Sequence, residues 1–152
     1  MKELKELIKI ADIHASRIQM VLNDLSYCLP FNETKITNLT KQELLLTDLL
    51  VNRFGKLQDL LGNKIINLFL IALDEYEDHL TTIDKLNKLE RFLIIENSTL
   101  WQEMRKARNH AAHEYPDNPN LTSLYLNDIV KFAPQLITIL DNIKIRINII
   151  HN

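Results

Sequence analysis

Hydrophobic residues recur along this chain every three or four positions, the spacing that places side chains on one face of an α-helix. The clearest stripe runs from about Lys2 to Cys28 and predicts a long first helix. A second long stripe predicts a last helix from about Leu121 to Ile149, which Pro134 is expected to kink. Between them, the polar residues from Phe31 to Leu39 predict a loop. Both ends of the chain are therefore expected to be long amphipathic helices.

The middle of the chain carries start and stop signals for shorter helices. Thr40 and Glu43 have the spacing of a capping box, which predicts a helix that continues to about Leu61. Gly62 and Asn63 then predict a break. A short, buried helical segment is expected to follow over residues 64–76.

Two further helices are expected after that segment. One begins at the Thr81–Thr82 pair and extends to about Ile95. The next begins at Asn97–Ser98–Thr99 and is ended by Pro116 and Pro119, because proline cannot continue a helix. Its apolar stripe consists of Leu100, Met104, Ala107 and Ala111.

The composition favours a single all-α domain. The chain has 152 residues, of which 46% are hydrophobic, and only two glycines and four prolines are available for turns between strands. This length is sufficient for one domain with a substantial core. We therefore expect residues 1–152 to form one up-and-down bundle of about five helices.

The net charge and the cysteine content exclude several classes of protein for this chain. The formal net charge of -2 argues against a protein that binds nucleic acid by charge alone, because such affinity comes from many phosphate contacts. The single Cys28 cannot form an internal disulfide, and the first residues lack the apolar core of a signal peptide. The longest apolar patch, residues 65–73, is far too short to span a bilayer. The expected location is cytoplasmic, with no membrane partner.

The segment that begins at Arg108 holds the candidate chemistry. On a helical wheel Arg108 lies at the edge of the apolar stripe, His113 lies further round, and Asn109 falls between them. A guanidinium beside apolar surface offers a planar donor fork that matches phosphate oxygens, and a histidine can exchange protons near neutral pH. The same spacing allows a simpler interpretation, in which these cations lie near a helix C-terminus because the macrodipole favours them there.

Neither a metal nor a cofactor is expected. His110 and His113 are the only histidines close enough in sequence to share a metal, and no cysteine or familiar carboxylate pattern accompanies them. The sequence also lacks a glycine-rich loop that could cradle a phosphate.

Arg108, Asn109, His113 and Tyr115 together form a pattern that resembles the R-x4-H-x-Y signature of the HEPN superfamily (higher eukaryotes and prokaryotes nucleotide-binding domains). Within that superfamily it is most similar to the HepT-like toxins. Residues 53–62 also resemble a stretch in one subgroup of HepT-like proteins, so the resemblance extends over most of the chain. It implies a HEPN-like bundle, a ribonuclease toxin, and a partner antitoxin of the minimal nucleotidyltransferase (MNT) type. In the resembling toxins the motif tyrosine accepts AMP from that antitoxin, which makes Tyr115 the candidate modification site.

The residues themselves suggest how RNA would be cut without a cofactor. RNA carries its own nucleophile, the 2′-hydroxyl, so a base and a cation that stabilises the transition state are sufficient. His113 is the candidate acid or base and Arg108 the phosphate clamp, while Asn109 would orient either the histidine or the phosphate. Arg105 and Lys106 are candidate RNA-binding residues because they belong to the densest basic cluster. One histidine cannot easily serve both sides of the phosphorus, so a homodimer is expected.

Two other classes of function fit the same sequence. The chain could be a non-catalytic accessory subunit that binds a nucleotide or substrate for a nucleotidyltransferase, or a purely structural helical partner. An RNA cleavage assay on the purified protein separates the ribonuclease from the accessory subunit.

Overall fold

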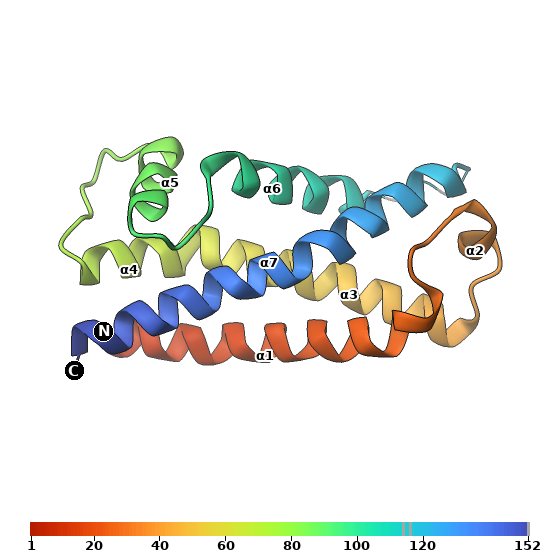
Figure 1. The fold of residues 1–152 in the computed structure, drawn as a ribbon, viewed down its shortest axis with the longest axis horizontal. Helices are drawn as coiled ribbons and strands as arrows, with labels where there is room; N and C mark the ends of the chain where they lie inside the picture. The colour runs from red at the N-terminus through yellow and green to blue at the C-terminus, as the bar shows by residue number, and fades with distance from the viewer. Residues whose placement is uncertain (114, 116, 152) are drawn as a thin grey trace.

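The computed structural model describes residues 1–113, 115 and 117–151, and every regular element in this part of the chain is a helix. The prediction of an all-α fold is therefore confirmed. Figure 1 shows an elongated bundle in which successive long helices run in opposite directions and both chain ends lie at the same end of the molecule.

The most extensive contact between two helices is the one between α1 (Lys2–Leu25) and α3 (Lys41–Leu60). A single 3₁₀ turn, Ser26–Cys28, extends α1 to the predicted boundary. The capping box predicted at Thr40 is present, since the Thr40 hydroxyl accepts from the Glu43 amide and the Glu43 carboxylate accepts from the Thr40 amide. Both helices contribute side chains with no solvent exposure to the core, among them Ile18, Leu50 and Phe54.

The predicted break at Gly62 and Asn63 is wrong. The chain continues from α3 through a π-helical turn, Leu61–Ile65, directly into α4 (Ile66–Ala72). Glycine in a helix costs only about 1 kcal/mol, and the burial of Leu61 and Ile65 outweighs that local preference. The helix ends instead at Ala72, and the chain turns away at Asp74, whose φ of 59° is left-handed.

The predicted loop over residues 31–39 contains a short helix, α2 (Glu33–Thr37). Asn32 caps it by accepting from the Lys35 amide. The preceding Phe31 is buried and exchanges two hydrogen bonds with the Asn127 side chain, through its backbone N–H and carbonyl. This anchor fixes α2 against the last helix, a contact that the local polar composition could not reveal.

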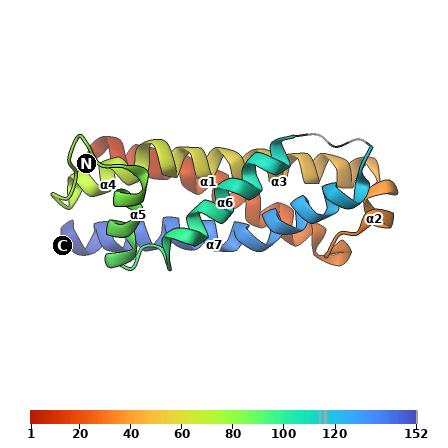
Figure 2. The same cartoon turned by 90° about the horizontal axis from the view of Figure 1, so that it is seen from above.

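α5 (Thr82–Arg91) and α6 (Ser98–Ala112) start as predicted. Thr81 forms a capping box with Asp84, and Asn97 caps α6 by accepting from the Leu100 amide. α5 ends four residues before the predicted Ile95, where the left-handed Leu93 turns the chain. Figure 2 shows α6 lying diagonally over one side of the bundle, which it contacts through α3 and α7.

The last helix, α7 (Pro119–His151), is longer than predicted and passes through Pro134. Pro119 is its first residue, where a missing N–H leaves no hydrogen bond unmade. Pro119 was expected to end the preceding helix, and that expectation is wrong. Pro116, predicted to do the same, lies outside the described residues. No helix in the described part of the chain combines the length and hydropathy needed to cross a membrane.

Candidate functional site

The end of α6 differs from the helical wheel drawn for it. α6 stops at Ala112, and His113 follows in extended backbone with φ -87° and ψ 139°. A proline at position 116 of a continued helix would clash with the carbonyl of Ala112, so the sequence disfavours further turns. The prediction that His113 lies on the helix face is therefore wrong, and the turn after α6 determines its position.

Arg108, on the last full turn of α6, is held by two neighbours. Its Nη2 donates to Asp59 Oδ2 of α3 at 2.7 Å, and its Nη1 donates to Asn109 Oδ1 at 3.3 Å. The side chain is 35% exposed and that of Asp59 is 50% exposed, so the ion pair remains open to solvent on one side. The guanidinium is oriented by protein groups while keeping free N–H donors.

A large cleft of about 820 Å³ lies beside this ion pair, between α2, α3, α6 and α7. Arg108 and His113 both line it, together with Tyr115 from the connection after α6. The other charged or phenolic residues in its wall are Asp48, Lys56, Asp59 and Tyr125. The cleft therefore combines the hydrogen-bonded guanidinium of Arg108, the exposed imidazole of His113 and two phenols.

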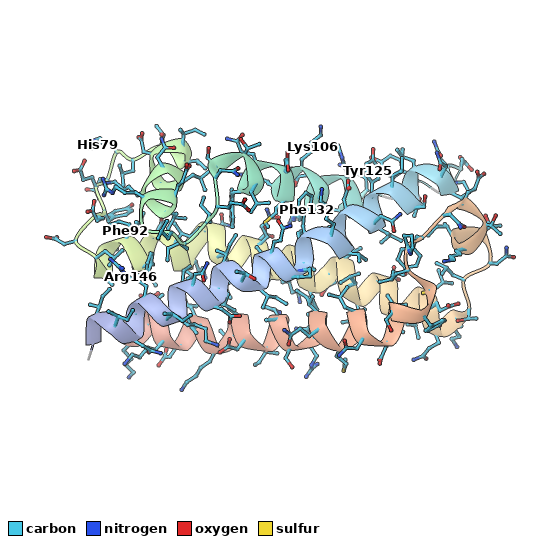
Figure 3. All side chains as sticks on the ribbon, viewed as in Figure 1. His79, Phe92, Lys106, Tyr125, Phe132 and Arg146 are labelled. Atoms are coloured by element: carbon cyan, nitrogen blue, oxygen red, sulfur yellow. The ribbon has the colours of Figure 1, made fainter. Side chains whose placement is uncertain are left out.

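Four aromatic rings form a continuous chain at the α7 side of this cleft. The ring of Tyr125 lies 4.6 Å from that of His110 and 5.3 Å from that of Tyr115, centroid to centroid. The ring of Tyr115 lies 6.5 Å from that of His113. Burial, with a contribution from Tyr115, raises the pKa of the Tyr125 phenol above its ordinary value. Figure 3 shows Tyr125 on the first part of α7, near the C-terminal end of α6.

A smaller polar cavity of about 330 Å³ lies on the other side of Arg108. Asn109 and Arg105 line this cavity and are not among the residues that line the large cleft. The remaining polar and aromatic residues in its wall are Gln58, Asp59, Asn63, Asn67, Thr82, Lys85 and Trp101. Arg108 and Asp59 are common to both sites, so the ion pair forms the boundary between them.

The structure thus divides the residues singled out from the sequence into three groups. Arg108, His113 and Tyr115 line the large cleft, whereas Arg105 and Asn109 line the polar cavity beside Arg108. Lys106 lines neither site and points outward from α6 in Figure 3.

Sequence reasoning missed the residues of α3 that complete both sites. Asp59 pairs with Arg108, and Gly55 lies under the same side chain. Both belong to residues 53–62, which attracted notice only through a resemblance. Their spacing of four residues places them on one helix face, a signal that could have indicated a surface prepared for α6.

The described residues contain no group of three or more histidine, cysteine, aspartate or glutamate side chains placed to hold a metal ion. The donors at the site are instead a guanidinium, an imidazole, amides and phenols. Side chains of these kinds can bind anions and exchange protons.

No protein-family model matches the chain, and no curated protein or solved structure matches it either.

Proposed function

We propose that this chain is a metal-independent ribonuclease toxin with a HEPN-like, HepT-like architecture. The observation that carries the proposal is that Arg108 and His113 line one cleft, with Asp59 orienting the guanidinium. Lys56, also in the wall of the large cleft, adds a second cation for the phosphate backbone.

The proposed reaction is a transfer of the phosphate to the neighbouring ribose. A base removes the 2′-hydroxyl proton, the 2′-oxygen attacks phosphorus, and an acid protonates the departing 5′-oxygen. The products are a 2′,3′-cyclic phosphate and a 5′-hydroxyl, so proton and charge balance without any cofactor. His113 supplies the proton transfer, and Arg108 stabilises the additional negative charge on the phosphoryl oxygens.

Asp59 and Asn109 act as positioning residues in this proposal. Each accepts a hydrogen bond from a different terminal nitrogen of Arg108, which fixes the plane of the guanidinium. Preorganised donors accelerate reactions because they do not have to reorient as charge develops. Asn109 therefore acts on the phosphate through Arg108.

We also propose that the active species is a homodimer. Among the described residues, one chain contributes a single histidine to the large cleft, and the reaction needs a base and an acid on opposite sides of phosphorus. A second copy facing the first would supply the other imidazole and a second Arg108. The MNT-type antitoxin is proposed as the partner that neutralises this site through Tyr115.

The experiment is RNA cleavage by the purified chain in the presence of EDTA, with fluorescent oligonucleotides resolved on denaturing gels. We expect a 2′,3′-cyclic phosphate product. The variants His113→Ala and Arg108→Ala should each lower the rate by about 10²–10³-fold. His79→Ala is the matched control, because His79 is exposed and lies at the opposite end of the molecule from Tyr125 in Figure 3.

Two results would contradict the proposal. A strict requirement for a divalent metal excludes the mechanism. Full activity of His113→Ala excludes His113 as the acid or base. Nucleotide binding without cleavage, in a protein that folds normally, supports the accessory-subunit alternative instead.

A further inference from the structure

The polar cavity contains amide groups whose hydrogen-bonding capacity is unused. Gln58 is only 4% exposed and lines the cavity, and neither its Nε2 nor its Oε1 has a partner among the described residues. Asn67 lines the same cavity, and its buried Oδ1 is likewise unpaired, while its Nδ2 donates to the Asn63 carbonyl at 3.4 Å. A buried polar group without a hydrogen-bond partner destabilises the protein, so a partner from outside the chain is favoured.

The rim of the cavity is positively charged. Lys85, Arg105 and Arg108 line it, and Asp59 is the one carboxylate among the described residues in its wall. Asp59 already accepts from Arg108, and Lys85 Nζ lies 5.8 Å from the centroid of the Tyr76 ring, a contact that still lets its ammonium donate to an anionic ligand. A phosphate at this rim would bind through charge-assisted hydrogen bonds.

The unpaired groups also define the uncharged part of the ligand. Two oxygens, on Gln58 and Asn67, need donors, and the Gln58 NH₂ needs an acceptor. An exocyclic amino group next to a ring nitrogen meets that need. A glutamine amide makes two hydrogen bonds with adenine in this way, to N6 and N7. A cavity of about 330 Å³ is within the range of small-molecule sites, about 300–1,000 Å³.

We infer that the polar cavity binds the base of an adenine nucleotide through Gln58 and Asn67, with its phosphate at Arg105 and Lys85. The inference rests on the proposed function only where RNA is taken as the source of that adenine. An adenosine next to the scissile phosphate would then place its base in the cavity while Arg108 holds the phosphate at the boundary. Cleavage would be selective for that base.

Trp101 is the only tryptophan of the chain and lines the cavity, so its fluorescence reports on occupancy. The full chain is titrated with AMP and with IMP, which has a keto group in place of the 6-amino group. We expect AMP to change the emission and to bind at least tenfold more tightly than IMP. Gln58→Leu should reduce AMP affinity to the level of IMP and should not lower thermal stability, because it removes an unpaired buried amide.

Gln135→Leu is the matched control. Gln135 also has an unpaired buried oxygen, but it is on α7 and lines neither site, so AMP affinity should stay unchanged. Equal affinities for AMP and IMP in the unmodified chain would overturn the inference, as would undiminished AMP binding by a folded Gln58→Leu variant. Absence of binding by calorimetry would overturn it too and would leave only water in the cavity.

A parallel measurement separates the inference from the ribonuclease proposal. RNA oligonucleotides carry adenosine or inosine beside the mapped cleavage position. Slower cleavage of the inosine substrate assigns the adenine to RNA, whereas equal rates together with AMP selectivity assign it to a free nucleotide. AMP binding without any cleavage supports the cavity and rejects the ribonuclease. Cleavage without AMP binding supports the ribonuclease and rejects the cavity as an adenine site.

Discussion

Gly55 of α3 lies directly beneath the side chain of Arg108 of α6. A Cβ placed on Gly55 would be 3.4 Å from Arg108 Nε and 3.7 Å from its Cγ, which is ordinary van der Waals contact. The chain's other glycine, Gly62, faces Trp101 more tightly, because a Cβ placed on it would be 3.1 Å from Cζ2 and the ring would have to shift slightly. The two glycines and the two α6 residues are each seven positions apart, so α3 and the π-helical turn that follows it let α6 approach closely at two successive points.

This arrangement gives a graded test at Gly55. Gly55→Ala should retain RNA cleavage within about twofold and gain up to about 1 kcal/mol in free energy of unfolding, because its methyl group fits and alanine favours helix. Gly55→Leu should displace the guanidinium from Asp59, lower cleavage at least tenfold and cost about 1–3 kcal/mol through overpacking. Cleavage rates and urea unfolding check both variants. Equal activity of the alanine and leucine variants would show that the position of Arg108 does not matter.

The Asp59→Asn variant tests whether the carboxylate positions Arg108 or merely stabilises the fold. The free energy of unfolding should change by less than about 1 kcal/mol, because both partners are partly exposed. Removing the negative charge should strengthen RNA binding, whereas loss of orientation should lower kcat about tenfold. Steady-state kinetics at fixed ionic strength would therefore show KM and kcat falling together. An unchanged kcat would rule out a positioning role.

His14 provides a test of stability against pH that is independent of the proposed function. This side chain is 9% exposed, and its Nδ1 accepts from Arg53 Nη1 at 3.1 Å, so it is neutral in the fold. Burial first, then the charges of Arg53 and Lys56, hold the pKa of His14 below its ordinary value. The unfolded chain binds a proton below about pH 6.5 that the folded chain rejects. The stability that the neutral His14 side chain contributes is therefore complete above pH 6.5 and is lost as pH falls below that value.

His14→Gln removes the titrating group while retaining an acceptor for Arg53. Between pH 8 and 5.5 the unfolding free energy of the unmodified chain should fall more steeply than that of the variant, by up to about 1.4 kcal/mol per pH unit. Urea unfolding at half-unit pH intervals measures both slopes. Parallel curves would mean that His14 takes up its proton as readily in the folded protein as in the unfolded chain.

The sequence predicted the helix starts correctly where local signals decide the structure. The capping residues Thr40, Thr81 and Asn97 all cap helices as predicted, because each needs only its own side chain and an amide three residues later. The break at Gly62 was wrong because that glycine serves contact with Trp101 within a continuous helix. Local propensity could not reveal a preference set by another helix.

The same distinction applies to the candidate site. Arg108 was found from the sequence because its helix position beside apolar residues is a local property. Asp59 lies 49 positions away in the chain, so its pairing with Arg108 depends on how α3 and α6 pack. His113 lines the same cleft as Arg108, but extended backbone after α6, and not the helical periodicity used for the prediction, brings it there.

Tyr115 is the last test, because its position predicts how the site would be switched off. It lines the large cleft with Arg108, so an AMP group on its phenol would place a phosphate where RNA phosphate is proposed to bind. Incubation with ATP, magnesium and an MNT-type antitoxin should add the mass of AMP at Tyr115 and abolish cleavage.

Tyr27 is the internal control, because it is 72% exposed and absent from the cleft, so it should remain unmodified. Tyr115→Phe should stay active under the same treatment. Inhibition of that variant to the same extent would mean that the antitoxin acts by occlusion alone.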